Sequence, residues 1–329
     1  MIALINRYVT AFGPSGSEDE VRSLLQADLK QLGAETQVDA LGNLSCLHAP
    51  GKDKNRARVL LMAHMDEIGV MVSHIDAHGF CRFLPLGGVR APWCVGARVR
   101  FGNGAIGTIG AEPHEGSAAL KFEDLYIDLG ASDQSTVTVN IGDSACFDRP
   151  LEASGQRLIA KSLDDRIGCV VLLETLRRLR STPHAVAFVF SVQEEMGLRG
   201  AGTAAFGFDP DFGIAVDVTR TGDTPKARPM DVALGKGPAI KLRDSGMIAD
   251  PALVRSLRAA GDHAKVPYQL EILEHGTTDA RAIQTARSGV PAGCISIPCR
   301  YVHTPSEMVD MRDVEGAIRL LVDLLGRKL

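Results

Sequence analysis

Histidine and acidic residues recur in this sequence beside segments that the hydrophobic pattern predicts as strands or helices. They are His64 and Asp66 after the apolar run 59–63, Asp164 and Asp165 before a helical pattern, Glu194 and Glu195 after the run 184–192, Asp217 in the run 212–218, and His303 after the run 294–297. Two histidines with several carboxylates and no thiolate are a typical ligand set for Zn²⁺, Mn²⁺ or Co²⁺ at a hydrolytic centre. The carboxyl ends of strands in an open α/β sheet line one crevice, where distant residues can converge. The sequence therefore predicts a metal centre at that edge.

Each of these residues also has a simpler explanation when it is taken alone. Two adjacent glutamates such as Glu194 and Glu195 are typical of a solvated loop, and acidic residues before a helix are favoured by the helix dipole. Asp217 is different, because an unpaired carboxylate between two valines of an apolar strand is costly. We favour the metal centre because all the positions lie at strand ends of one predicted sheet.

The elements that must position these residues belong to two kinds. Residues up to about 67 and from about 159 onward alternate apolar strand patterns with amphipathic helices, which predicts an α/β fold with helices on both faces of a mostly parallel sheet. Residues 68–158 instead contain short β-type runs, at 70–74, 80–84, 97–101, 125–129 and 136–141, separated by glycine and asparagine turns. We therefore expect a catalytic α/β domain split into 1–67 and 159–329, with an inserted, barrel-like all-β domain at 68–158.

Composition excludes several classes of function. The chain has 329 residues and a formal net charge of −4, without the basic stripe that nucleic-acid binding needs. No apolar run approaches the roughly 18 residues of a membrane span.

The seven cysteines are scattered and form no Cys-x-x-Cys pair. Together with the lack of a secretory signal, this pattern predicts a cytoplasmic protein with reduced thiols. Residues 102–107 match G-x-G-x-x-G, but Asn103-Gly104 within a β segment predicts a hairpin and not a dinucleotide site.

Nearly end to end, the sequence resembles the M42 family of dinuclear metallo-aminopeptidases, which includes glutamyl and tetrahedral aminopeptidases. The motifs that carry the resemblance are 11–16 (Ala-Phe-Gly-Pro-Ser-Gly), 63–69 (Ala-His-Met-Asp-Glu-Ile-Gly), 160–166 (Ala-Lys-Ser-Leu-Asp-Asp-Arg), 193–197 (Gln-Glu-Glu-Met-Gly), Asp217 and 303–307 (His-Thr-Pro-Ser-Glu). One motif departs from the family pattern Gly-Gly-Thr-Asp-Ala, because Thr277 follows Gly276 where a second glycine is usual.

The resemblance implies two divalent metal ions per subunit, with Zn²⁺ expected and Co²⁺ or Mn²⁺ as alternatives. It implies that Asp164 bridges the two ions, that His64 and Asp217 complete the ligands of one ion, and that Glu195 and His303 complete those of the other. Two ions ~3.5–4 Å apart lower the pKa of a shared water and stabilise the attacking and leaving atoms.

The resemblance also implies that Glu194 is the general base and that Asp66 orients His64. The expected function is hydrolysis of the N-terminal peptide bond of short peptides, in a homo-oligomer, typically a tetrahedral dodecamer formed through the inserted domain. Two alternatives remain open: a related di-metal hydrolase that cleaves another amide such as an N-acyl amino acid, or was described as a glycanase, and a non-catalytic metal-binding peptide receptor. The receptor would be expected to lack the general base, whereas Glu194 is present.

Overall fold

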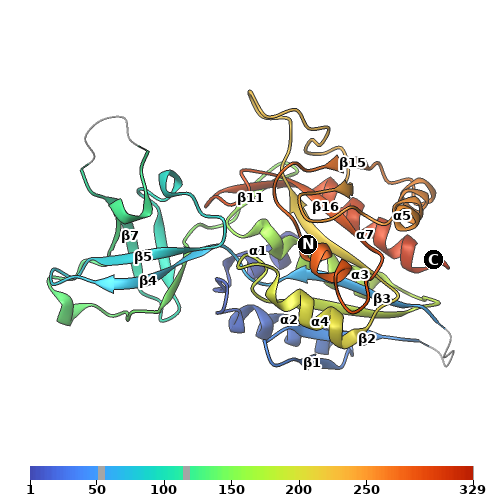
Figure 1. Cartoon of the computed structure of the whole chain (residues 1–329), viewed down its shortest axis with the longest axis horizontal. Coiled ribbons are helices and arrows are strands. Elements are labelled where there is room, and N and C mark those ends of the chain that lie inside the picture. Colours follow the sequence, from blue (N-terminus) through green and yellow to red (C-terminus); the bar gives the residue numbers. More distant parts are fainter. Residues whose placement is uncertain (51–55, 114–118, 329) are drawn as a thin grey trace.

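The computed structural model of the chain describes residues 1–50, 56–113 and 119–328 and has an α/β body with a β-barrel projecting from one side (Figure 1). The helices are α1 (Ile2–Thr10), α2 (Asp19–Gln31), α3 (Leu163–Arg178), α4 (Arg199–Phe208), α5 (Pro251–His263), α6 (Asp279–Gln284) and α7 (Met311–Leu325), with short 3-10 turns η1 (Ala91–Trp93), η2 (Phe122–Asp124) and η3 (Gln134–Thr136). None of the described helices is both long and apolar enough to cross a membrane.

An 11-stranded mixed sheet forms the centre of the body. Its strands are β1 (Thr36–Val38), β2 (Leu44–His48), β3 (Arg58–His64), β10 (Glu152–Ser154), β11 (Arg157–Ala160), β12 (Ala185–Ser191), β13 (Phe212–Thr219), β14 (Ala239–Arg243), β15 (Gln269–Ile272), β16 (Ala292–Arg300) and β17 (Glu307–Asp310). The neighbours β12, β3, β13 and β16 run parallel, so their carboxyl ends meet at one edge. The predicted α/β class is confirmed; these four parallel strands lie at the centre of the sheet, and β1, β2, β10, β11 and β17 pair antiparallel.

Strand β3 shows why the sheet needs helices on both faces. Val59, Leu61 and Ala63 pack into the core that contains residues of α1, α2, α3, α5 and α7. Leu60 and Met62 point to the opposite core, which contains residues of α4 and α6. Because successive side chains of a strand alternate between its faces, a continuous apolar run is buried only when both faces are covered.

The projecting unit is a closed barrel with its own apolar core. Its strands are β4 (Gly69–Ile75), β5 (Cys81–Leu86), β6 (Arg98–Phe101), β7 (Ile106–Ala111), β8 (Leu125–Asp128) and β9 (Ser144–Phe147). Strands β6 and β7 form the hairpin predicted at Asn103-Gly104. The strand predicted at 136–141 is wrong: the side chain of Asp133 accepts hydrogen bonds from the N–H groups of Ser135 and Thr136 and closes the turn η3 there. Local side-chain bonds of this kind override the β preference of the residues that follow.

Candidate metal centre

All the residues predicted as metal ligands come together at the carboxyl edge of the parallel strands. His64 is the last residue of β3, Asp217 lies near the end of β13, and His303 follows β16. Asp164 lies at the start of α3, and Glu195 follows β12. Together with Glu194 they line one cavity of about 500 Å³. Residues as far apart in the sequence as His64 and His303 are thus neighbours, because the strand order places their elements side by side.

Asp164 lies between the two histidines. Its Oδ1 is 3.1 Å from Nε2 of His64, and its Oδ2 is 3.3 Å from Nε2 of His303. Burial opposes the charge of this carboxylate, but the hydrogen bonds to His303 and His64 hold the pKa of Asp164 below its usual value. Each carboxylate oxygen therefore faces a different imidazole, which is the arrangement that a carboxylate shared by two cations requires.

A further carboxylate flanks each histidine. Oδ1 of Asp217 lies 4.0 Å from Nε2 of His64, and Oε1 of Glu195 lies 3.1 Å from Nε2 of His303. Oε1 of Glu195 is buried, and its contact with Nε2 of His303 is an ion-pair contact without hydrogen-bond geometry. Burial alone would lower the pKa of His303, but the charges of Glu195 and Asp164 raise it to about 11. A buried carboxylate oxygen without a hydrogen bond is costly unless a cation compensates it.

The cavity holds more buried acid than the imidazoles can balance. Burial raises the pKa of Asp217 well above its usual value, and the neighbouring charge of Asp164 adds to the effect. Burial likewise raises the pKa of Glu194 well above its usual value; the charge of His64 opposes this shift, and the charges of Asp217 and Glu195 add to it. Divalent cations would remove the repulsion between these neighbouring carboxylates. The residues present therefore fit a metal centre.

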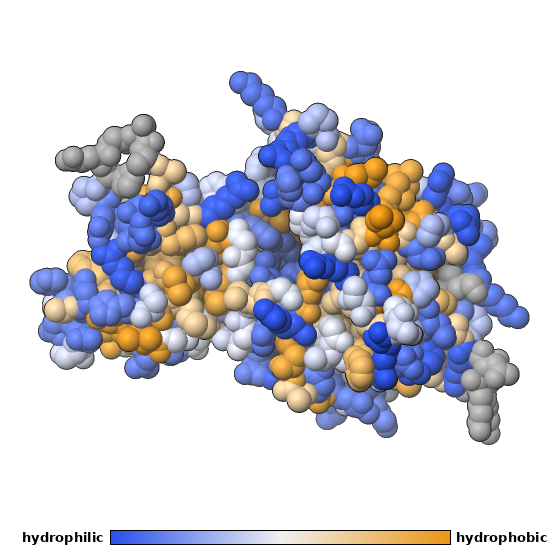
Figure 2. Space-filling view, viewed as in Figure 1, coloured by the Kyte–Doolittle hydropathy of each residue, from blue (hydrophilic) through white to orange (hydrophobic). Residues whose placement is uncertain are grey.

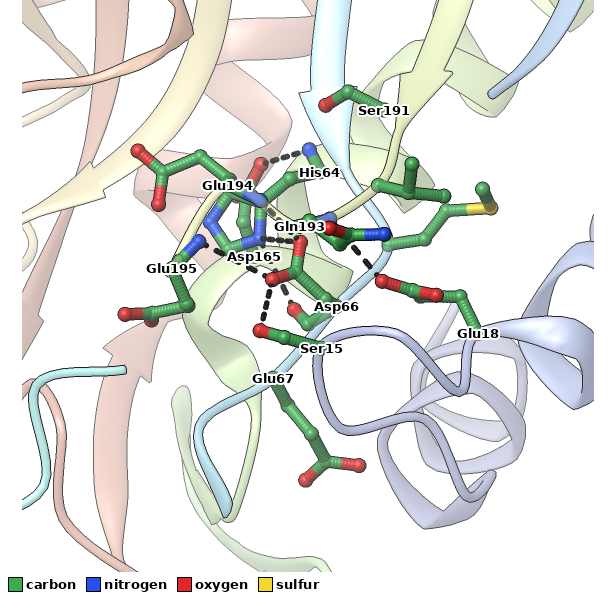
Figure 3. A network of polar contacts seen from close by, with 12 residues as sticks. Ser15, Glu18, His64, Asp66, Glu67, Asp165, Ser191, Gln193, Glu194 and Glu195 are labelled. Carbon is green, nitrogen blue, oxygen red and sulfur yellow. Dashed lines mark hydrogen bonds and ion pairs between the residues drawn. The ribbon is translucent and has the colours of Figure 1, made fainter. Parts of the chain in front are cut away.

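Asp66 lies directly behind His64 (Figure 3). Nδ1 of His64 lies 3.0 Å from the backbone carbonyl oxygen of Asp66 and 3.4 Å from its Oδ1. A carbonyl oxygen can only accept, so Nδ1 carries a proton and donates it. Nε2, the atom that faces Asp164 and Asp217, is therefore the nitrogen available as a ligand.

The carboxylate of Asp66 also holds the segment with the two glutamates. Its Oδ1 accepts the N–H of Glu194 at 2.9 Å and its Oδ2 accepts the N–H of Glu195 at 3.2 Å. Oδ2 accepts a third hydrogen bond, at 2.5 Å, from the hydroxyl of Ser15 (Figure 3). The sequence interpretation linked Asp66 to His64 alone, and these backbone contacts become visible only in the structure.

Two more acidic residues reach the cluster without an assigned role in the sequence. Glu307 accepts the N–H of Asp164 through Oε2 and the N–H of His303 through Oε1, both at 2.9 Å. Asp165 accepts the N–H of His64 at 3.2 Å, and its carboxylate forms a second possible ligand group with His64 and Asp217. Glu307 lies four residues after His303 in the 303–307 motif, and that spacing was the only signal for it.

A buried charge network lies beneath the cavity. Glu67 accepts hydrogen bonds from Lys161, at 2.7 and 2.8 Å, and from Arg166, at 3.2 Å. Arg166 also donates to the backbone oxygens of Tyr8, Gly13 and Met65. The network ties the segments before α2, after β3 and at the start of α3 together. Removing one partner of such a buried set is strongly destabilising, because the other charge is then left without compensation.

The barrel contributes two residues to the wall of the site. Gly87 and Gly88 follow β5 directly, and an added Cβ at Gly88 would lie 2.2 Å from Nδ1 of His303. At Gly87 it would lie 2.8 Å from Oε2 of Glu195, and the φ of +78° at this position also favours glycine. The imidazole of His303 and the carboxylate of Glu195 thus lie against bare backbone of the barrel.

The sequence profile of the M42 glutamyl aminopeptidase family matches residues 42–320. The chain belongs to the M42 peptidase family. It is 34% identical to a lysyl aminopeptidase of Pyrococcus furiosus over 346 aligned positions, which cover 98% of this chain and 96% of the relative. As an M42 member, the protein is a hydrolase of the aminopeptidase class.

Solved structures of aminopeptidases share the M42 fold described above. An aminopeptidase from the archaeon Desulfurococcus kamchatkensis superposes with a TM-score of 0.95 at 38% identity, over 99% of this chain and 94% of that one. The TET1 peptidase of Pyrococcus horikoshii superposes with a TM-score of 0.89 at 30% identity, over 99% of both chains.

Thr277, which departs from the M42 pattern, lies on the wall of the 500 Å³ cavity that contains the predicted metal ligands, called the metal cavity below. Its hydroxyl donates to Oδ1 of Asp244 at 3.2 Å, and that oxygen also accepts the N–H groups of Gly246 and Met247. Gly276 keeps a left-handed φ of +102°, and Thr277 is not among the residues with positive φ. The larger side chain is therefore anchored in the wall without the backbone conformation that favours glycine.

Proposed function

We propose that this M42 protein is a metal-dependent aminopeptidase that hydrolyses the N-terminal peptide bond of short peptides. The observation that carries the proposal is the position of Asp164, with one carboxylate oxygen toward His64 and the other toward His303. His64 and Asp217 would hold one divalent cation, His303 and Glu195 a second, and Asp164 would be shared. When bound, a cation pair of Zn²⁺, Co²⁺ or Mn²⁺ supplies a water of lowered pKa and polarises the scissile carbonyl.

The general base in this proposal is Glu194. It takes the proton of the attacking water and delivers it to the leaving amine, so the same carboxylate acts first as base and then as acid. The carboxylate of Asp66 accepts the backbone N–H of Glu194 and so holds Glu194 in place. The backbone carbonyl of Asp66 accepts a hydrogen bond from Nδ1 of His64.

The reaction class is tested with a tripeptide and its N-acetylated form. An enzyme that needs a free α-amine releases residues one at a time from the first peptide and spares the second, which mass spectrometry of the products shows directly. Internal fragments of a longer peptide as first products would contradict the proposal. Release of acetate from the blocked peptide would instead support a deacylase.

We further propose that the protein forms a homo-oligomer, a tetrahedral dodecamer, and that residues 68–158 act as an oligomerisation domain that restricts access. The TET1 peptidase can assemble into a tetrahedron or a large octahedral shell. The barrel of the present chain exposes large apolar side chains, with Leu84 61% and Ile141 64% exposed, and Figure 2 shows apolar patches on it. Light scattering of L84D and I141D should show smaller particles, whereas I248D on the α/β body should leave the size unchanged. A monomeric wild type would contradict the proposal.

The cysteines support a reducing compartment, for which we propose the cytoplasm. All seven are buried and unpaired in the structure. Burial raises the pKa of Cys46 and of Cys94 to about 12, so these thiols stay protonated and unreactive at neutral pH.

A further inference from the structure

A second cavity of about 610 Å³ adjoins the metal cavity. The two share part of their walls, including Arg220, Leu273 and His275. The second cavity continues toward Trp93 of the turn η1 and Tyr301 after β16, which are both partly exposed. The metal site is therefore open toward a larger space that the proposed ligands do not occupy.

Two arginines in the wall of the second cavity form no ion pair within 4.0 Å among the described residues. Arg220 directly follows β13, three residues after Asp217, and Arg90 lies two residues after Gly88 on the segment that leaves β5. The guanidinium of Arg90 lies over the ring of Trp93, 4.9 Å from its centroid. Partial burial lowers the pKa of Arg220, and the charge of Arg90 lowers it further; the charge of Asp164 opposes this effect, but the pKa stays below its usual value. The two cations therefore repel each other across the cavity.

The other charges that line the second cavity are already balanced. Arg228 pairs with Glu274 at 2.9 Å, Arg300 pairs with Asp223 at 2.7 Å, and His275 lies 3.3 Å from Glu274. The excess positive charge is therefore confined to Arg90 and Arg220. Like charges held close together without a counter-ion are destabilising, and an anionic ligand between them would remove that cost.

We propose that Arg90 and Arg220 form a subsite that binds a carboxylate of the peptide substrate while its N-terminal peptide bond lies at the metal centre. Guanidinium groups suit this role, since their planar donors match both oxygens of a carboxylate. The inference rests on the proposed function and adds a substrate class to it: short peptides with a carboxylate within reach of the metal site. That carboxylate is either the C-terminus of a very short peptide or an acidic side chain.

The source of the carboxylate is decided with four peptides. Leu-Ala-Ala-amide has no carboxylate, while the free acid Leu-Ala-Ala, Leu-Glu-Ala-amide and Glu-Ala-Ala-amide each carry one at a different place. We expect kcat/KM to be at least about tenfold higher for one of the three than for the neutral amide. The R220Q and R90Q variants should remove that ratio, because each deletes a charge-assisted hydrogen bond. R220E should invert the preference toward a peptide with lysine at the same place.

Two matched variants separate the subsite from a general effect of charge. Arg281 lines the metal cavity but not the second cavity, and Arg287 lines neither. R281Q and R287Q should reduce the carboxylate ratio far less than R220Q does. Equal kcat/KM values for all four peptides would overturn the proposal. So would a carboxylate preference that is lost in R281Q but kept in R220Q.

Calorimetric titration with Ala-Ala and with Ala-Ala-amide tests the subsite apart from turnover when the metal-loaded protein carries E194Q, which removes the proposed general base. The free acid should bind more tightly than the amide to E194Q, and adding R220Q or R90Q should remove the difference. If the wild type cleaves no peptide but this difference is found, the proposed reaction fails and the subsite stands. If peptides are cleaved and the difference is absent from E194Q or persists with both arginine substitutions, the subsite fails alone.

Discussion

The backbone N–H of Glu194 donates to Oδ1 of Asp66 at 2.9 Å, and the same carboxylate oxygen lies 3.4 Å from Nδ1 of His64. One buried carboxylate therefore fixes both a proposed metal ligand and the residue proposed as general base. Asp66 therefore helps to set the position of Glu194 relative to His64, and the loop after β12 is not the only element that does so. Outer carboxylates of this kind orient ligating histidines and raise their basicity.

The first prediction separates Glu194 from its neighbour Glu195. E194Q keeps the size and polarity of the side chain but cannot accept the proton of the water. We expect both cations to remain bound and kcat to fall by about 10²–10⁴, the range typical for loss of a general base. E195Q should instead reduce metal occupancy, so that excess metal restores part of the activity.

Metal stoichiometry measured beside kcat distinguishes the possible outcomes. Metal lost in E194Q and kept in E195Q would mean that the two roles are exchanged. Wild-type behaviour of both variants would mean that the two residues are an ordinary pair of loop glutamates.

The second prediction concerns removal of the metal. Exhaustive chelation should abolish hydrolysis, and Zn²⁺, Co²⁺ or Mn²⁺ should restore it. The thermal midpoint should also fall, because a cation that binds only the folded state at 1,000 times its Kd contributes about 4 kcal/mol to stability. Calorimetry before and after chelation, with the metal content checked by mass spectrometry, measures both effects. Full activity of verified metal-free protein would refute the metal-dependent mechanism.

The third prediction tests Glu307 as a positioning residue. Its two carboxylate oxygens accept the backbone N–H groups of Asp164 and His303, and glutamine offers only one oxygen for these two donors. We expect E307Q to weaken metal binding by about 10- to 100-fold while the fold stays intact. E315Q on α7, which removes a half-buried carboxylate that pairs with Arg178, is the matched control. Unchanged metal affinity in E307Q would show that other contacts hold these two backbones.

The fourth prediction follows from the protonation of the site. Without metal, Glu195 and Asp164 overcome the opposing effect of burial and raise the pKa of His303 to about 11, so its imidazole carries a proton at neutral pH. A cation binds only the neutral imidazole, and its binding must therefore release protons. The association constant should rise with pH between about 6 and 8. Titration in two buffers of different ionisation enthalpy gives the number of protons released, and a buffer-independent heat would contradict the prediction.

The parts of the fold that the sequence predicted are those governed by local pattern. The apolar run 59–63 lies within β3, because a strand covered on both faces needs such a run, and the turn at Asn103-Gly104 joins β6 to β7. The pattern did not reveal β9, which pairs with both β4 and β6 and owes its extended form to these partners. Strand formation at such places depends on neighbours that are far away in the sequence.

The proposed site divides in the same way. Residue type and position at strand ends and strand–helix junctions were enough to point to His303 and to the pair Asp164 and Asp165, because such positions in one sheet converge. The M42 resemblance then selected Asp164 as the ligand. The contacts of Glu307 with Asp164 and His303 depend on backbone N–H groups, which every residue except proline possesses, and so leave no trace in composition. The position of Glu307 four residues after His303 was the only signal for it.

The close approach of Gly88 to His303 gives the barrel a route by which it could act on the proposed metal centre. Because an added methyl group would lie 2.2 Å from the imidazole, a rotation that moved the barrel backbone by about the same amount would displace the ring. If His303 holds a cation and the barrel binds a subunit partner, as proposed, a partner that fixed the barrel in one orientation would change the affinity for that cation. Reciprocity would then require the same coupling free energy in the other direction, so that metal binding would shift the equilibrium between small and large assemblies.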